Sequence, residues 1–263
     1  MVKPLRILND NLLLFGIDLK KLAQSMKAVP FYFRSLGELN RQSKGSENLF
    51  PFRRKIPCLH DRFVESGTAG GHYFHQDLLV ARMIYLNNPR KHVDIGSRMD
   101  GFIAHLASFR TVEVMDIRPL KSSTVNIRFI QSDLMRDVQE PFIDYCDSIS
   151  SLHAIEHFGL GRYGDKIDPY GYLLGLNNIY RILKKSGKFY FSVPIGPQRI
   201  EFNAHRVFGL RYLLELLSEK YEIKSFSFVD DRGDLHENAS LKENMENNCG
   251  CFFGCGIFEL TKR

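Results

Sequence analysis

The stretch from His92 to Pro119, HVDIGSRMDGFIAHLASFRTVEVMDIRP, restricts the possible folds of this chain more than any other. It contains a short β-rich run at 92–95, a turn that begins at Gly96, apolar residues at helical spacing, and a second apolar run that ends at Asp116. Two strands joined by a helix form a parallel βαβ unit with a right-handed crossover. The stretch therefore predicts an α/β domain built around a parallel sheet.

The turn after the first strand has the features of a nucleotide-binding site. A glycine lets a ligand approach the backbone, and the N-terminus of the following helix offers free N–H groups. Asp116 follows Gly96 after about 20 residues, the interval typical of a carboxylate that binds ribose hydroxyls. The alternative is a βαβ unit that binds nothing, in which Asp94 caps the turn.

Two side chains indicate which nucleotide the turn would bind. A dinucleotide fingerprint needs G-x-G-x-x-G, and Arg98 stands here in place of its middle glycine. The carboxylate of Asp94 suits a ligand with positive charge, such as the ammonium group of S-adenosylmethionine, and suits a pyrophosphate poorly. The pattern therefore favours S-adenosylmethionine over NAD.

Composition excludes several other classes of protein. A chain of 263 residues with 44% hydrophobic and 25% charged residues is an ordinary globular protein. The net charge is +6, but the basic residues are scattered and the cluster at 53–55 is short, so no nucleic-acid partner is predicted. No run approaches the ~18 apolar residues of a membrane span. We expect a cytoplasmic protein, whose oligomeric state the sequence leaves open.

The cysteines predict neither a disulfide framework nor a metal site. Their count of five is odd, and three of them, Cys249, Cys251 and Cys255, crowd one end of the chain. These three lack a fourth nearby ligand, and Cys255 lies in a run that resembles a strand. No metal ligand is therefore predicted.

Outside the βαβ unit, the chain divides into an N-terminal helical extension at 1–60 and an α/β domain at 61–263. The extension contains a short helix at 18–26 that Pro30 brings to an end. The glycine-rich segment at 66–77 either folds over a ligand or is a plain connector.

Polar residues follow the later strands where ligands bind in parallel sheets. Asp133 follows a third strand at 126–130, so Asp94, Asp116 and Asp133 are expected to face one crevice. A fourth strand at 145–152 precedes the polar loop HAIEHFGLGRYGDKIDP, which suits proton transfer. The alternative is a hydrogen-bonded structural loop. HAIEH differs from the H-E-x-x-H zinc pattern.

The last third of the chain predicts the rest of the sheet. A helix at 177–185 with a C-cap at 186–187 precedes a fifth strand at 188–193. Asn203, His205 and Arg206 follow it and could face the same crevice. Strands at 222–229 and 256–260 form an antiparallel pair, with an exposed loop at 230–248 between them.

These motifs resemble those of class I S-adenosylmethionine-dependent methyltransferases over residues 72–263. VDIGSRMDG resembles the first motif of that superfamily, SLHAIEHF the fourth-strand motif, and IYRILKKSGKFYFSVP the helix, glycine turn and fifth strand. A closer resemblance, through DIGSRMDGFIAHLASFR, SLHAIEHFGLGRYGDKIDPYG and FNAHRVF, is to the uncharacterised family called "Caenorhabditis protein of unknown function".

The resemblance implies a doubly wound, Rossmann-like α/β sheet of about seven strands with the N-terminal helical extension. It implies methyl transfer from S-adenosylmethionine to an unidentified small-molecule or glycan-like acceptor. His157 is the first candidate for the base and His205 the second, and Glu156 next to His157 could orient it or raise its pKa. The cofactor-binding candidates are Asp94, Gly96, Ser97, Arg98, Gly101, Asp116, Ile117, Asp133, Leu134 and His153.

Arg98 departs from the glycine-rich turn of methyltransferases. Its side chain could fill part of the cofactor site or pair with Asp94, and either arrangement would weaken cofactor binding. Arg98 therefore favours a second hypothesis, a catalytically silent methyltransferase-like binding or scaffold protein. A nicotinamide-dependent oxidoreductase is a third, disfavoured by the absent middle glycine.

Overall fold

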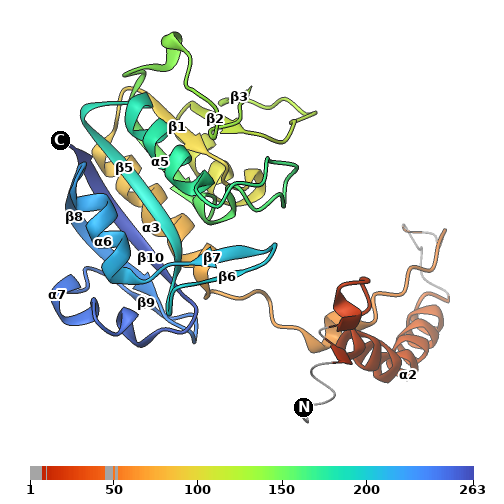
Figure 1. The fold of residues 1–263 in the computed structure, drawn as a ribbon. Coiled ribbons are helices and arrows are strands. Elements are labelled where there is room, and N and C mark those ends of the chain that lie inside the picture. The colour runs from red at the N-terminus through yellow and green to blue at the C-terminus, as the bar shows by residue number, and fades with distance from the viewer. Residues whose placement is uncertain (1–7, 10, 45–49, 51–52) are drawn as a thin grey trace. The chain divides into compact units, whose positions relative to one another are not determined.

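The computed structural model describes residues 8–9, 11–44, 50 and 53–263, and the chain divides into one compact unit up to Thr68 and another from Ala69 (Figure 1). The first unit contains helix α2 (Leu19–Gln42), whose first turn is capped by the Asp18 carboxylate. The helix continues through Pro30, so the prediction that this proline ends it is wrong. Helical residues on both sides offset the one hydrogen bond that proline removes.

The second unit is built on one eight-stranded sheet with the order β3-β2-β1-β4-β5-β10-β8-β9. The first five strands in this order are parallel, and the last three are antiparallel to their neighbours. The strands are β1 (His92–Ile95), β2 (Val112–Asp116), β3 (Ile127–Gln131), β4 (Cys146–Leu152), β5 (Leu183–Ile195), β8 (Tyr221–Val229), β9 (Leu235–His236) and β10 (Gly254–Lys262). The predicted fold class and the antiparallel terminal pair are confirmed.

Helices cover both faces of this sheet because alternate residues of the strands are apolar on both sides. Phe189 and Phe191 belong to one core cluster, whereas Tyr190 between them belongs to the other. The first cluster also takes residues from α5 and α6, and the second from α3 and α4. The helices of this unit are α3 (His72–Asn87), α4 (Ala104–Ala107), α5 (Gly171–Ile182), α6 (Leu210–Ser218) and α7 (Leu241–Asn244), with a π-helical turn at Met99–Ile103 and 3-10 turns at Glu140–Phe142, Ile155–His157 and Asn248–Gly250.

Two predicted elements differ from the structure. The helix expected at 177–185 is α5, which ends at Ile182, and the expected C-cap at 186–187 lies inside β5. Ser186 has a φ of 61° there, and the β4–β5 register shifts in the same region, so the strand contains an irregularity that looks like a helix cap in sequence. The insertion at 230–248 is not a plain loop, because it holds β9 and α7.

A small antiparallel hairpin follows β5. It consists of β6 (Arg199–Glu201) and β7 (His205–Val207). The hairpin brings Ala204 and the residues after it close to the loop that follows β4.

Candidate functional site

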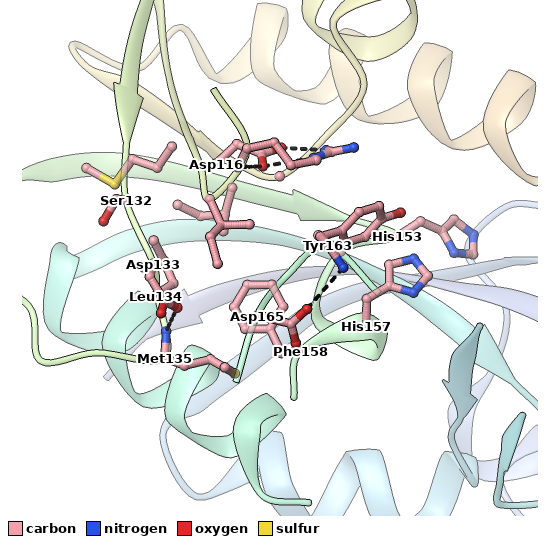
Figure 2. Close-up of a pocket in the computed structure, with 16 residues that line it drawn as sticks. Asp116, Ser132, Asp133, Leu134, Met135, His153, His157, Phe158, Tyr163 and Asp165 are labelled. Carbon is pink, nitrogen blue, oxygen red and sulfur yellow. Dashed lines mark hydrogen bonds and ion pairs between the residues drawn. The ribbon is translucent and has the colours of Figure 1, made fainter. Parts of the chain in front are cut away.

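A pocket lies at the carboxyl ends of β1, β2, β3 and β4 (Figure 2). The strand order reverses between β1 and β4, and such a switch point is where open α/β sheets bind ligands. The pocket has about 530 Å³ of space free of atoms, including its open mouth. The exposed surface of its lining is mostly apolar, although half of its residues are polar. The lining consists of Ile95, Gly96, Met115, Asp116, Ile117, Arg118, Ser132, Asp133, Leu134, Met135, His153, Ala154, His157, Phe158, Tyr163 and Asp165.

Gly96 brings the backbone close to the loop that follows β4. Its φ is 75°, and a Cβ placed on it would lie 3.0 Å from the Cβ of Ala154. Its N–H donates to the carbonyl of Met115 at the end of β2. A residue with a side chain would therefore be strained here and would press on the β4 loop.

Asp94 supports the turn from beneath instead of facing the pocket. Its carboxylate is fully buried and accepts the Ser97 N–H at 2.9 Å, the Ser97 hydroxyl at 2.8 Å and the Ser150 hydroxyl at 2.5 Å. Burial raises the pKa of Asp94 to about 7, against the lowering effect of these hydrogen bonds. Asp94 and Ser97 are thus joined to each other and not to the pocket lining.

Arg98 is not among the residues that line the pocket. Its guanidinium binds Asp100 through two hydrogen bonds of 3.1 and 2.9 Å and lies 5.9 Å from the centre of the Tyr73 ring. The predicted pairing with Asp94 is therefore wrong, and so is the prediction that Arg98 fills part of the site. Gly101 is outside the lining as well, and a Cβ there would lie 2.9 Å from the Asp77 carboxylate.

Asp116 reaches the pocket as predicted, but a neighbour already occupies its carboxylate. Arg118 donates its backbone N–H at 2.8 Å and two guanidinium N–H groups at 3.0 and 2.5 Å to the Asp116 oxygens. The same guanidinium lies 4.4 Å from the centre of the Tyr163 ring. A ribose would therefore compete with Arg118 for the Asp116 oxygens.

The far end of the pocket combines one carboxylate with apolar walls. Asp133 accepts the N–H of Met135 at 3.0 Å and pairs with Arg136 at 3.2 Å. Ile117 and Leu134 line the same space, so the structure brings together Asp116, Ile117, Asp133 and Leu134 as predicted. Figure 2 shows Ser132, Asp133 and Leu134 at one end of the pocket and His153 and His157 at the other.

The loop after β4 is held together by hydrogen bonds to one carboxylate and by a glycine packed against the backbone. Asp165 accepts the backbone N–H groups of Gly159, Gly161 and Tyr163 at 2.8, 3.1 and 3.1 Å. A Cβ on Gly159, whose φ is 79°, would lie 2.0 Å from the carbonyl oxygen of Asp168. These contacts place Tyr163 and Asp165 in the pocket wall.

The two histidines of this loop have different environments. His157 lines the pocket, and its Nδ1 lies 2.6 Å from the carbonyl oxygen of Ala204, to which it donates when its ring is neutral. Burial lowers the pKa of His157 despite the nearby charge of Glu156. In the neutral ring with the proton on Nδ1, Nε2 of His157 carries a lone pair and can accept a proton.

Glu156 is paired with His153 and not with His157. Nδ1 of His153 lies 2.7 Å from Oε1 of Glu156, whereas Nε2 of His157 is 3.8 Å from the same oxygen. Burial opposes ionisation of Glu156, but attraction to His153 outweighs it and lowers the pKa of the carboxyl. The structure therefore places Glu156 where it orients His153.

The hairpin residues lie outside the pocket. Nε2 of His205 is 3.1 Å from the Glu201 carboxylate, and its ring centre is 6.5 Å from that of His157. Arg206 is buried and donates to the carbonyls of Glu156 and Phe158 at 3.3 and 2.6 Å. The expectation that Arg206 faces the crevice is wrong, because its guanidinium donates its hydrogen bonds to backbone carbonyls of the β4 loop instead.

Residues 110–249 match the family described as "Caenorhabditis protein of unknown function, DUF268". The chain belongs to this family. The match confirms the closer resemblance found in the sequence, and the family's description names no activity. No curated protein matches the sequence.

Solved structures of methyltransferases share the fold of this family member. The 1,6-didemethyltoxoflavin-N1-methyltransferase of Burkholderia thailandensis has a TM-score of 0.51 at 16% identity, over 71% of this chain and 78% of that chain. N-methyltransferase NodS of Bradyrhizobium japonicum WM9 has a TM-score of 0.50 at 12% identity, over 74% of this chain and 99% of that chain. The predicted class I methyltransferase fold is confirmed. No helix in the described part of the chain is long and apolar enough to cross a membrane.

Sequence reasoning missed several pocket residues of this family member. Arg118, Tyr163 and Asp165 all line the pocket, yet none of them was predicted to do so. Arg118 could have been found from its position two residues after Asp116, where a long cation reaches back to a carboxylate. Tyr163 and Asp165 belong to the polar loop at 153–169 that the sequence predicted to supply such groups, but only the fold of the loop decides which of its side chains reach the pocket wall.

Proposed function

We propose that this protein binds S-adenosylmethionine and transfers its methyl group to a small-molecule or glycan-like acceptor. The observation that supports this most is the position of Asp116 and the Gly96 turn in one pocket at the switch point of the sheet. The Burkholderia thailandensis enzyme with the same fold was crystallised with bound 1,6-didemethyltoxoflavin and S-adenosylhomocysteine.

The residues of the pocket fit the parts of this cofactor. Asp116 is the candidate for the ribose hydroxyls, and Asp133 with Leu134 is the candidate for the adenine. Gly96 has no side chain, so it leaves room for the methionine moiety of the cofactor next to the turn, which Asp94 holds through its hydrogen bonds to Ser97. Ser97, Arg98 and Gly101 contribute backbone to this turn, and no side chain among these three lines the pocket.

The cofactor supplies a methyl group on a sulfonium, which an acceptor displaces in line. The protein's share in this chemistry is mainly positioning of the two partners. A hydroxyl acceptor also needs a base, and His157 is the candidate because its Nδ1 is fixed on Ala204 and its Nε2 is a free acceptor at neutral pH. His205, with Nε2 facing Glu201, is the second candidate.

Calorimetric titration with S-adenosylmethionine, S-adenosylhomocysteine and NAD tests the proposal. We expect micromolar affinity for the first two, no affinity for NAD, and at least about a tenfold loss in Asp116→Ala, because the ribose loses about 1.5 kcal/mol or more of hydrogen bonding to a charged group. Asp234→Ala, an exposed carboxylate outside the pocket lining, is the control and should bind as the natural protein does.

Binding of none of the three ligands would overturn the proposal and favour the scaffold hypothesis. Binding of NAD alone would favour the oxidoreductase. Once an acceptor is found, unchanged turnover in His157→Ala would exclude His157 as the base.

A further inference from the structure

Three potential metal ligands from distant parts of the chain meet beside the pocket. They are His72 in the first turn of α3, His153 after β4, and Cys255 in β10. One ligand atom from each residue lies within 4.8 Å of those from the other two. Imidazole nitrogens with a thiolate form a donor set that zinc prefers among the common biological cations.

His153 presents an unpartnered nitrogen in this cluster. Its side chain is only 5% exposed, and its Nε2 is buried without a hydrogen-bond partner. A buried polar atom of this kind costs free energy unless something binds it. Nδ1 of the same ring is held by Glu156 at 2.7 Å, so when Nδ1 carries the proton, Nε2 offers a lone pair. A carboxylate on the far nitrogen is the usual support of a metal-binding histidine.

The other two ligands are buried or half-buried. Cys255 is fully buried, and its Sγ makes long contacts of 3.7 Å to Gln76 and 3.9 Å to the Gly256 carbonyl and also interacts with the His153 ring. The rings of His72 and His153 are nearly parallel, with centres 5.4 Å apart.

Backbone contacts fix the position of the first turn of α3, which carries His72. The N–H of Gly71 donates to the carbonyl of Gly233 at 3.0 Å, and a Cβ on Gly233 would lie only 3.0 Å from the Gly71 nitrogen. His72 follows directly. The three donors around a tetrahedral zinc, at about 2.0 to 2.3 Å from the ion, would lie about 3.5 Å apart. The donor atoms lie within 4.8 Å of one another, so side-chain rotations would have to bring them up to about 1 Å closer to bind the ion.

From this geometry we infer that His72, His153 and Cys255 bind one zinc ion, with a fourth position left open. The thiol proton of Cys255 leaves to solvent as the thiolate binds the ion, and a proton on Nε2 of His153 leaves with it. The ion would join α3, the β4 loop and β10 at the end of the pocket where His153 lies (Figure 2).

A metal-binding measurement on the full chain tests this inference. Any affinity tag is removed first, and a chelator then removes bound metal. With CoCl₂ alone we expect one cobalt per chain and a thiolate-to-cobalt charge-transfer band, which ZnCl₂ then abolishes. Cys255→Ser should lose the band, and His153→Gln should weaken zinc affinity at least about 100-fold. Cys251→Ser is the matched control, since Cys251 is buried too but lies outside the cluster, and it should keep the band.

Absence of stoichiometric cobalt or zinc binding in the natural protein would overturn the inference. So would a band that survives Cys255→Ser or disappears in Cys251→Ser. If circular dichroism shows that Cys255→Ser or His153→Gln is unfolded, His72→Gln replaces it in the test, because His72 is only half-buried. Unchanged zinc affinity in His72→Gln would also overturn the inference. The readout is the metal alone, so its outcome is separate from that of the S-adenosylmethionine titration.

Discussion

At the scale of single residues, Arg118 is the side chain that most changes the interpretation of the pocket. The sequence places the Asp116 carboxylate at the end of β2, and in the structure the Arg118 guanidinium donates hydrogen bonds to it. A carboxylate accepts about four hydrogen bonds, and Arg118 already supplies three to Asp116. Two ribose hydroxyls can bind fully only after the guanidinium moves.

Arg118→Met should therefore strengthen the binding of S-adenosylhomocysteine. The change keeps the apolar stem and removes the guanidinium, whose ion pair with Asp116 is worth about 1 kcal/mol at a partly exposed site, so we expect up to about a fivefold lower Kd by calorimetry. Arg232→Met, an exposed arginine outside the pocket lining, should leave the Kd unchanged. A Kd raised several-fold in Arg118→Met would mean that Arg118 contacts the ligand.

At the scale of elements, the loop between β4 and α5 depends on a glycine that no side chain can replace. Gly159 and Gly164 both have φ near 80°, but a Cβ on Gly159 meets the Asp168 backbone at 2.0 Å, whereas one on Gly164 meets nothing within 4 Å. The two positions share the same backbone strain and differ only in the clash.

Gly159→Ala should destabilise the protein by about 3 kcal/mol or more, and Gly164→Ala by about 1 kcal/mol. Thermal unfolding measures the difference, and for a domain of this size each kcal/mol lowers Tm by about 2 to 4 °C. Equal losses in the two variants would show that the loop moves away from the new methyl group without cost.

At the scale of the whole molecule, the buried Asp94 makes global stability depend on pH. Its pKa is raised from 3.8 to about 7 in the folded protein, chiefly by burial. Above the unfolded value, the folded state keeps a proton that the unfolded state releases, so the free energy of unfolding falls as pH rises toward the folded pKa.

Asp94→Asn should remove this dependence, because Asn cannot ionise and can still bond Ser97 and Ser150. Between about pH 5 and pH 8, the natural protein should lose about 2 kcal/mol or more relative to the variant, at about 1.4 kcal/mol per pH unit. Denaturant unfolding at both pH values measures this. A difference that stays constant with pH would mean that Asp94 is ionised throughout.

The sequence by itself determined the order of the elements, the parallel sheet and the carboxylates that follow its strands. These depend on local features, namely apolar periodicity, glycine breaks and residues just past a strand end. Asp116, Asp133 and Leu134 reached the pocket because a strand end fixes their position within a residue or two.

Only the tertiary structure decided which of these side chains turn inward and which distant residues meet. Asp94 and Arg206 follow the same sequence rule as Asp116, yet both are buried in hydrogen bonds with other segments. The meeting of His72, His153 and Cys255 depends on how three elements pack across the sheet. Local patterns encode position along the chain, and such contacts depend on non-local packing, which no short stretch of sequence specifies.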